Sequence, residues 1–254
     1  MLLSFVGCNT DGGGDNSGNV GECVAHTDID DNGSCDACGD SVLVTVDFYV
    51  INDLHGKFAD TDAQPGVDEL TTYLKNSVKS DEHAVLLSTG DMWQGSSESN
   101  LTYGNIITDW MNEMDFAAMA LGNHEFDWGE EYIAANAAIA EFPFLAINIY
   151  DRETNQRVEY ASASVMVECG DIDIGIIGAI GDCYSSISYE QVSDIYFKTG
   201  DELTALVKSE ADRLREGGAE IIVYSLHDGH ENGGGSFISS GKLSDYYDPS
   251  LSNG

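Results

Sequence analysis

The chain is poor in basic side chains. Only 10 of its 254 residues are Lys or Arg, against 45 Asp or Glu, which gives a formal net charge of -35. Ten basic side chains are too few to form the basic surface that nucleic-acid binding requires. A nucleic-acid polymer is therefore excluded as a partner. The chain also lacks an apolar run long enough to cross a membrane, and it has no internal repeat.

The acidic residues are spread along the chain and do not form blocks. We therefore interpret them as a solvated surface, adapted to salt or to abundant divalent cations, and not as an interaction tail. A length of 254 residues allows one large α/β domain or two small ones, and a hydrophobic content of 42% is enough to bury a core.

A short apolar run near the N-terminus, residues 3–7, ends at Cys8. This resembles the end of a bacterial lipoprotein signal, in which the cysteine carries the lipid anchor. A Gly-rich tether follows at residues 11–18, so residues 1–20 are interpreted as a signal remnant and linker. The expected location is extracytoplasmic, lipid-anchored at the cell surface or secreted. The alternative is a plain apolar N-terminus with a buried cysteine.

Residues 21–40 form a small module rich in Cys and Asp. Cys23 with His26 and Cys35 with Cys38 have the spacing of a zinc knuckle, but in an exported protein a disulfide competes with zinc. Residues 28–33 copy the first half of a calcium loop, although the twelfth position is glycine. A Zn or Ca site and a disulfide-stapled spacer stay open as alternatives. So do a disulfide and two separate thiols for the remaining pair, Cys169 and Cys183.

From residue 41 to 254 apolar strand-like runs alternate with helical stretches, which predicts an α/β sheet domain. The expected strands are residues 42–51, 84–88, 117–121, 144–149, 161–167, 172–180 and 221–226. The expected helices are residues 66–80, 105–114, 130–140 and 200–217.

Ligand-type side chains follow four of these strands directly. The four segments are Asn52-Asp53-Leu54-His55, Gly90-Asp91, Gly122-Asn123-His124-Glu125 and His227-Asp228. In α/β sheets, ligands bind outside the carboxyl ends of the strands, so these side chains are expected to converge. Each segment alone is weak evidence, because Gly-Asp after a strand is often only a turn. All four in order favour a single site.

The residue types suit two divalent ions. Carboxylate, imidazole and amide oxygen together favour zinc, manganese, iron or cobalt. Asp53 and His55 are one residue apart and can point the same way in an extended segment, while Asp91 stands where a carboxylate can bridge two ions. Two such ions clamp phosphoryl oxygens and activate a water for in-line attack.

With these motifs the chain resembles the calcineurin-like metallophosphoesterases. The stretch Gly122-Asn123-His124-Glu125-Phe126-Asp127-Trp128-Gly129 is most similar to the branch of 5'-nucleotidases, 2',3'-cyclic phosphodiesterases and UDP-sugar hydrolases. The resemblance covers about residues 44–254 and implies a four-layer α/β/β/α sandwich.

The resemblance also implies a role for each matching residue. Asp53 and His55 match ligands of a first metal, Asp91 the bridging carboxylate, and Asn123 and His227 ligands of a second metal. His124 matches a histidine that is not a ligand and that protonates the leaving oxygen or stabilises charge. Asp127 matches the carboxylate that orients His124, although it also suits a helix N-cap.

One motif of the family is missing. A Gly-His-x-His is expected about 30 residues beyond His227. The only Gly-His pair after His227 is Gly229-His230, and it lacks the second His of the motif. We interpret His230 as a loop residue, with a substitute ligand as the alternative. The sequence ends at Gly254, about where the strand before that motif would begin, so the resemblance implies a catalytic domain truncated at its C-terminal end. Each metal would then lack one ligand, and this chain alone is expected to be weak or inactive.

The function expected from the sequence is an exported, metal-dependent hydrolase of nucleotide phosphate esters, of the 5'-nucleotidase or cyclic phosphodiesterase type. Two alternatives remain. One is a non-catalytic, metal-binding surface module, favoured by the missing motif, the calcium-like loop and the acidity. The other is a phosphoesterase with a different substrate.

Overall fold

The structure is a computed structural model that describes residues 2–4, 43–57, 59 and 66–228. Its first sheet contains four parallel strands, each paired with the next along the chain. They are β3 (Asp47–Ile51), β4 (Ala84–Ser88), β5 (Ala118–Ala120) and β6 (Phe144–Leu145). Because the four strands run the same way, their carboxyl ends meet at one edge of the sheet.

A second sheet of three strands packs on the first. In it β9 (Ile172–Ile180) pairs antiparallel with β8 (Ser164–Cys169) and parallel with β11 (Ile221–His227). Two short antiparallel pairs complete the strands, β1 (Leu2–Ser4) with β2 (Leu43–Thr45) and β7 (Ile149–Asp151) with β10 (Ile195–Phe197).

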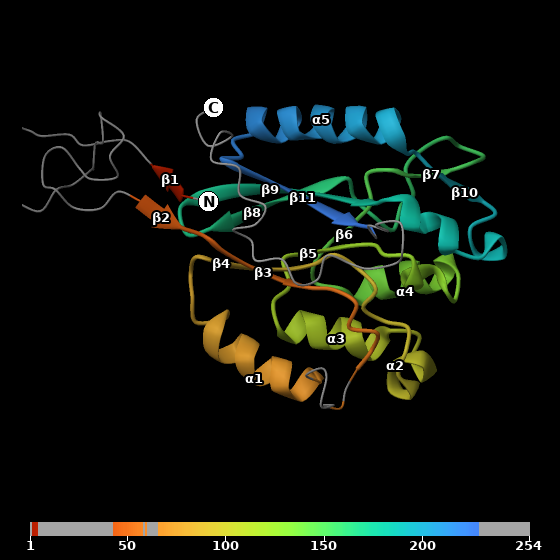
Figure 1. The fold of residues 1–254 in the computed structure, drawn as a ribbon, viewed down its shortest axis with the longest axis horizontal. Coiled ribbons are helices and arrows are strands. Elements are labelled where there is room, and N and C mark those ends of the chain that lie inside the picture. The colour runs from red at the N-terminus through yellow and green to blue at the C-terminus, as the bar shows by residue number, and fades with distance from the viewer. Residues whose placement is uncertain (1, 5–42, 58, 60–65, 229–254) are drawn as a thin grey trace, which may run out of the picture.

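Helices cover the outer faces of both sheets (Figure 1). On the side of the first sheet lie α1 (Val67–Ser77), α2 (Ser97–Leu101), α3 (Asn105–Glu113) and α4 (Glu130–Ile139). On the side of the second lies α5 (Gly200–Glu216). Three short 3-10 turns occur as well, η1 (His124–Phe126), η2 (Asp182–Ser186) and η3 (Tyr189–Gln191). The order of layers is helix, sheet, sheet, helix, as the family resemblance implied.

Alternating side chains of the strands build the cores between these layers. In β4, Val85 and Leu87 face the second sheet, while Leu86 faces the helices of the first. In β9, Ile174 faces the first sheet and Ile177 packs under α5. A period of two is what a strand buried on both faces requires, so the apolar runs in the sequence are explained by burial in the middle layers.

Gly178 shows how closely the two sheets approach. A Cβ atom at this position would lie 2.2 Å from the Cβ of Leu145 and 2.9 Å from its carbonyl oxygen. Backbone cannot yield in the way that a flexible side chain does, so only glycine allows β9 to cross β6 here. The carboxyl ends of β6 and β9 therefore lie close together.

Most of the expected elements are present within a few residues of their predicted ends, but several predictions need correction. The expected strand 42–51 is two strands, β2 and β3, which pair with different partners, β1 and β4. Residues 144–149 are not one strand: Ala146 donates to the Ser162 carbonyl and Ile147 to that of Gly178, so no single ladder continues past Leu145. The expected strand 161–167 begins only at Ser164. The helix α2 and the strands β1 and β10 were not predicted.

The structure decides between the alternatives for the two cysteines after residue 43. Cys169 and Cys183 are both free thiols, so the disulfide is wrong. The Cys169 thiol approaches the Glu82 carbonyl at 3.7 Å, and the Cys183 thiol approaches that of His227 at 3.2 Å.

Several sequence predictions fall on residues that the structure does not describe, and they stay predictions. They are the anchor at Cys8, the linker, the 21–40 module and the role of His230. Within residues 2–4, 43–57, 59 and 66–228, no helix is both long and apolar enough to cross a membrane.

Candidate metal centre

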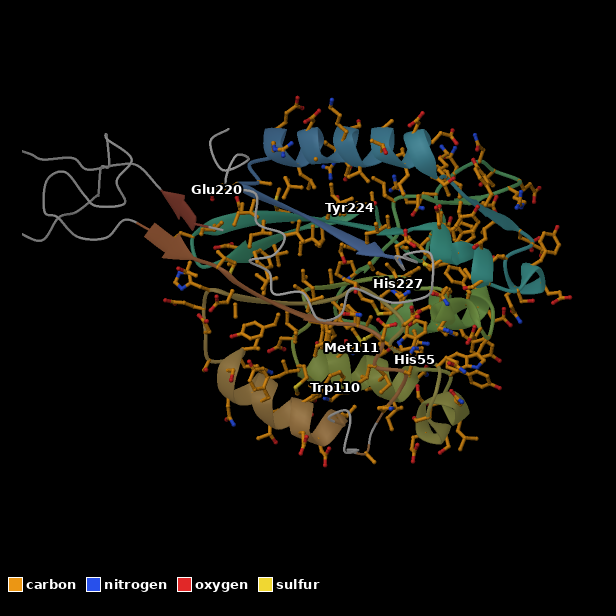
Figure 2. All side chains as sticks on the ribbon, in the orientation of Figure 1. His55, Trp110, Met111, Glu220, Tyr224 and His227 are labelled. Atoms are coloured by element: carbon orange, nitrogen blue, oxygen red, sulfur yellow. The ribbon has the colours of Figure 1, made fainter. Side chains whose placement is uncertain are left out.

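The segments after β3, β4, β5 and β11 meet around one cavity of about 430 Å³. Figure 2 shows His55 and His227, from the first and last of these segments, on the same side of the molecule. The cavity is lined by Asn52, Asp53, His55, Thr89, Asp91, Asn123, His124, Cys183, Leu226, His227 and Asp228. All five predicted metal ligands and His124 therefore lie in one place, as the strand-end argument required.

The backbone at three of these positions is left-handed. Asp53, His55 and Asp91 have φ angles of 54°, 51° and 55°, a region that residues other than glycine rarely enter. Hydrogen bonds between the two loops hold this conformation: the Asp53 amide donates to the Gly90 carbonyl at 3.1 Å, and the His55 amide to that of Asp91 at 3.1 Å. Strain held by its surroundings is typical of sites where side-chain direction matters more than local stability.

Two glycines let the loops approach one another. A Cβ at Gly122 would lie 2.3 Å from the Asp91 carboxylate, and one at Gly90 would lie 2.5 Å from the Gly122 amide nitrogen. Any side chain at either position would push the loops after β4 and β5 apart. The glycines before Asp91 and Asn123 are thus part of the site's construction.

One half of the site consists of Asp53, His55 and Asp91, whose ligand atoms all lie within 4.8 Å of one another. The Nδ1 atom of His55 is 2.8 Å from the Gln94 carbonyl oxygen, to which it donates as N–H. That hydrogen bond fixes the tautomer and leaves Nε2, with its lone pair, on the side of Asp53, 4.0 Å from Oδ1. Two carboxylates and one imidazole nitrogen in this space fit a divalent transition metal.

The other half consists of Asn123 and His227, again with Asp91. His227 Nδ1 lies 2.7 Å from the Thr89 carbonyl oxygen, which leaves Nε2 directed into the cavity. That Nε2 atom is 3.1 Å from Asn123 Oδ1 and 3.3 Å from Asp91 Oδ2. Asp91, with 4% of its surface exposed, therefore stands between both groups of donors, which is the position of a bridging carboxylate.

His124 and Asp127 form a pair beside these donors. His124 Nδ1 is 2.8 Å from Asp127 Oδ2, and the His124 amide donates to Asp91 Oδ1 at 2.9 Å. Burial acts to lower the pKa of His124, but the hydrogen bond to Asp127 and the charges of Asp91 and Asp127 outweigh it, so the pKa is raised. A histidine held in this way keeps its proton to higher pH, which suits a general acid.

Glu125 is a residue of the site to which the sequence analysis gave no role. It is completely buried, and its carboxylate accepts hydrogen bonds from the amides of Asp91, Met92 and Gly122 at 2.7–2.8 Å. Burial and the charge of Asp91 raise the pKa of Glu125 to about 7. Its only signal in the sequence is its place in Gly122-Asn123-His124-Glu125, and nothing there shows that the side chain turns inward to join two loops.

Cys183 also lines the cavity without having been predicted to do so, next to Asp228 from the last of the four predicted segments. The Cys183 amide donates to Asp228 Oδ1 at 3.2 Å. Burial, together with the charges of Asp228 and Asp91, raises the pKa of the Cys183 thiol to about 12. Cys183 is therefore a neutral thiol near neutral pH and not a nucleophile.

A family model described as calcineurin-like phosphoesterase matches residues 46–247 of the chain. The chain belongs to this family. Among curated relatives, it is 32% identical to an apyrase of Tabanus yao over 192 residues and 30% identical to the 5'-nucleotidase of Bos taurus over 169 residues. These matches cover 70% and 65% of this chain but 34% and 29% of the relatives, so this phosphoesterase chain spans about a third of their length.

Solved structures show the same fold. The NAD nucleotidase of Haemophilus influenzae matches with a TM-score of 0.62 and 24% identity, over 75% of this chain and 35% of that one. A 5'-nucleotidase precursor from Thermus thermophilus matches with a TM-score of 0.61 and 24% identity, over 73% and 38%. The four-layer sandwich of this phosphoesterase is thus the one that these neighbours contain. Members of the family use divalent metals, in agreement with the donors found here.

The contact between His227 and Asp91 predicts how the metal-depleted protein responds to pH. Burial alone would lower the pKa of His227, but the hydrogen bond and charge of Asp91 raise it to about 9. Because the folded value lies above the ordinary 6.5, the stabilisation is complete below pH 6.5 and is lost as the pH rises through 9. We expect the free energy of unfolding to fall by on the order of 2–3 kcal/mol over this range.

Urea unfolding of the chelator-treated protein at pH 6, 7, 8 and 9 measures this loss. His227→Asn removes this titrating group but keeps Glu125, whose pKa is about 7, so its stability should change much less than that of the unaltered protein between pH 8 and 9, where Glu125 is already ionised. An equal decline in both proteins would show that other groups cause it.

Proposed function

We propose that the protein to which this chain belongs hydrolyses phosphate esters of nucleotides with the help of two divalent ions. The observation that carries the proposal is the position of Asp91 between two groups of donors, next to the His124–Asp127 pair. The substrate class is supported by the names of the relatives, which include an apyrase, a 5'-nucleotidase and a 2',3'-cyclic-nucleotide 2'-phosphodiesterase/3'-nucleotidase.

In this proposal Asp53, His55 and Asp91 would hold one ion, and Asp91, Asn123 and His227 would hold the other. The ions would supply Lewis acidity toward the phosphoryl oxygens and an attacking water at neutral pH. Hydrogen bonds from His55 Nδ1 and His227 Nδ1 to carbonyl oxygens keep both rings oriented with Nε2 directed toward the other donors of the site. Either ring would otherwise need to be ordered when the ion binds, at a cost in affinity.

His124 acts on the leaving group. Its Nδ1 is bound to Asp127, so Nε2 is the nitrogen that can reach a substrate in the cavity that His124 lines. In the protonated ring, Nε2–H donates the proton to the departing ribose oxygen, and Asp127 stabilises the imidazolium until then. The raised pKa of His124 keeps that proton available near neutral pH.

His124→Ala should therefore slow hydrolysis most for substrates whose leaving group needs a proton. Hydrolysis of AMP, whose alkoxide leaves poorly, is expected to slow by about a hundredfold to ten-thousandfold in kcat. Bis(p-nitrophenyl) phosphate, whose nitrophenolate leaves without a proton, should lose much less. Both rates are measured after metal depletion and reloading with Mn²⁺, with Asp109→Asn on the exposed face of α3 as the control.

The assay uses the longest product of the gene, because the chain spans only about a third of its relatives. If that protein hydrolyses neither substrate with Mn²⁺, Zn²⁺, Fe²⁺ or Co²⁺, the proposed function is wrong. Equal losses on both substrates in His124→Ala would keep the enzyme but exclude the proton-donor role.

We propose further that the protein acts outside the cytoplasm. The support is the short apolar run that ends at Cys8 and the Gly-rich tether behind it. Labelling of cells with a radioactive fatty acid tests the anchor, with Cys8→Ser as the control that should lose the label.

A further inference from the structure

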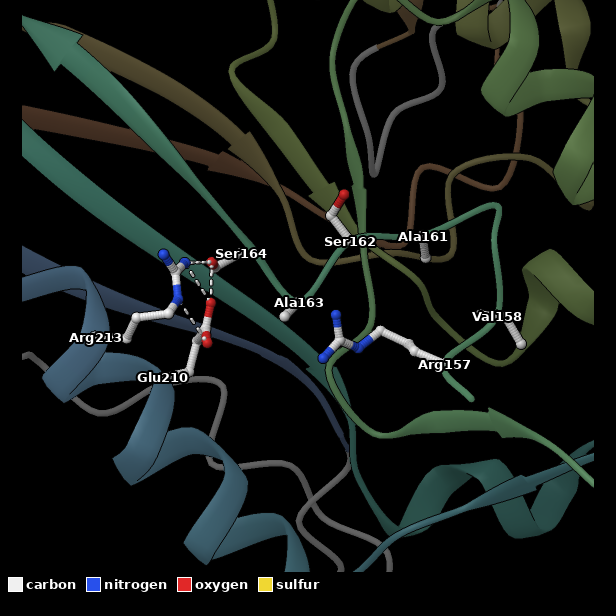
Figure 3. A pocket seen from close by; sticks show the side chains of 8 residues that line it. All are labelled: Arg157, Val158, Ala161, Ser162, Ala163, Ser164, Glu210 and Arg213. Atoms are coloured by element: carbon white, nitrogen blue, oxygen red, sulfur yellow. Dashed lines mark hydrogen bonds and ion pairs between the residues drawn. The ribbon is translucent and has the colours of Figure 1, made fainter. Parts of the chain in front are cut away.

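A second cavity, of about 550 Å³, lies between the segment before β8 and helix α5 (Figure 3). It is lined by Arg157, Val158, Ala161, Ser162, Ala163, Ser164, Glu210 and Arg213. None of these residues lines the metal cavity. Two arginines in one cavity are unusual for a chain that has 10 basic residues against 45 acidic ones.

Arg213 is neutralised within the cavity wall. Its Nε and Nη2 atoms donate to the two oxygens of Glu210 at 3.1 and 2.7 Å, and Nη2 also donates to Ser164 Oγ at 3.1 Å. Ser164 donates to Glu210 in turn. The hydrogen bond from Arg213 is the largest cause that lowers the pKa of Glu210, and the charge of Arg157 adds to it. Glu210 is therefore ionised, and its single charge is matched by Arg213.

Arg157 remains without a partner of this kind. Its Nε atom is fully buried and makes no hydrogen bond within the described part of the chain. Figure 3 shows its guanidinium across the cavity from the Ser164–Glu210–Arg213 group, with Ala163 between them. The Nη atoms of Arg157 extend into the cavity, and no side chain in the described part of the chain accepts a hydrogen bond from them (Figure 3). They can therefore donate to an anion that enters the cavity.

The backbone holds Arg157 in this position before any ligand binds. Arg157 forms a bridge with Tyr150, and the amide of the following Val158 donates to the Ile149 carbonyl at 3.3 Å. Val158 is itself buried in the core beneath the first sheet. The backbone of Arg157 is therefore fixed by its bridge to β7, which lowers the backbone part of the entropy that binding would cost.

We propose that this cavity is a binding site for a small oxyanion, a carboxylate or a phosphate group, held by the guanidinium of Arg157. A planar guanidinium offers two parallel N–H groups to the two oxygens of such an anion. The charges of Arg157, Arg213 and Glu210 sum to one positive charge, in a protein whose total is -35. The cavity is thus a local exception on a surface that repels anions, which favours a specific site over general attraction.

Isothermal titration of the metal-depleted protein with succinate and with inorganic phosphate, in separate arms, tests this site. Metal depletion keeps phosphate from binding through ions at the other cavity, so the result does not depend on the proposed hydrolysis. We expect saturable binding of one anion per chain, and Arg157→Gln should weaken it by about tenfold or more. Succinate alone, phosphate alone or both as ligands would identify the anion class.

Arg215→Gln is the matched control, since Arg215 is paired with Asp212 on the exposed side of α5 and does not line the cavity. It should bind the anion like the unaltered protein. Arg157→Lys keeps the charge but loses the planar fork, so it should bind with intermediate affinity; it also serves if Arg157→Gln fails to fold by circular dichroism. Equal affinity in all variants, or no saturable binding of either anion, would overturn the proposal.

Discussion

Asp91→Asn is expected to lower the affinity for divalent metal, and the hydrolytic rate with it, by more than about a hundredfold. Loss of an outer partner of a metal ligand already costs roughly tenfold to a hundredfold, and in the proposed site Asp91 would contact both ions directly. Its Oδ2 atom lies 3.3 Å from His227 Nε2, and the carboxylate also belongs to the group with Asp53 and His55. The substitution therefore weakens both halves of the site at once.

The substitution should leave the fold intact, which makes the result easy to interpret. Asn has the same shape, and its side-chain oxygen can still accept the hydrogen bond from the His124 amide, now 2.9 Å from Asp91 Oδ1. Metal content after equilibrium dialysis against Mn²⁺ or Zn²⁺ is measured by mass spectrometry, beside the rate on AMP. Asp109→Asn removes one of the 45 acids without touching the site and should bind metal normally. A variant at Asp91 that retained normal metal content would refute its bridging position.

The sequence predicted the convergence of the donors because each donor directly follows an apolar strand. For the donors after β3, β4 and β5 the strand order hardly matters, since these strands lie in one parallel sheet and their carboxyl ends reach the same edge. His227 ends β11 of the second sheet, so its place beside them depends on how the two sheets pack. It could not predict the left-handed backbone of Asp53, His55 and Asp91, because that conformation is held by hydrogen bonds to a loop about 35 residues away in the chain. The intrinsic backbone preferences of Asp and His favour negative φ angles over the left-handed region.

The same distinction explains the errors in the fold. The apolar pattern of segment 144–149 predicts one strand, yet Asn148 within it is fully buried and bonds to the ends of two other segments. Its side-chain Nδ2 donates to the carbonyl oxygens of Ile180 and Lys198 at 2.7 and 3.0 Å. These partners come together only in the folded protein, so no local pattern could have shown the break. The three-residue strand β10 was not predicted for the same reason: it is a strand only because it pairs with β7.

Glu125→Ala is expected to have the largest effect on stability, a loss of more than about 4 kcal/mol in the free energy of unfolding. The carboxylate is completely buried and accepts from three backbone amides, those of Asp91, Met92 and Gly122. Each buried amide left without an acceptor costs about 1–3 kcal/mol, and alanine provides none. Urea unfolding of the metal-depleted protein measures the change, with Glu113→Ala at the exposed end of α3 as the control, expected within about 0.5 kcal/mol.

Glu125→Gln separates the hydrogen bonds from the empty space that alanine leaves. Gln keeps the volume and one oxygen, which can accept from the amides of Asp91 and Gly122 that now share Oε2. Its NH₂ group would then face the Met92 amide, donor against donor, so we expect a loss of about 1–3 kcal/mol. Because Glu125 supports the strained backbone of Asp91, metal affinity should fall in the same order, least in Gln and most in Ala. If stability fell while metal affinity stayed constant, Glu125 would join the loops without positioning Asp91.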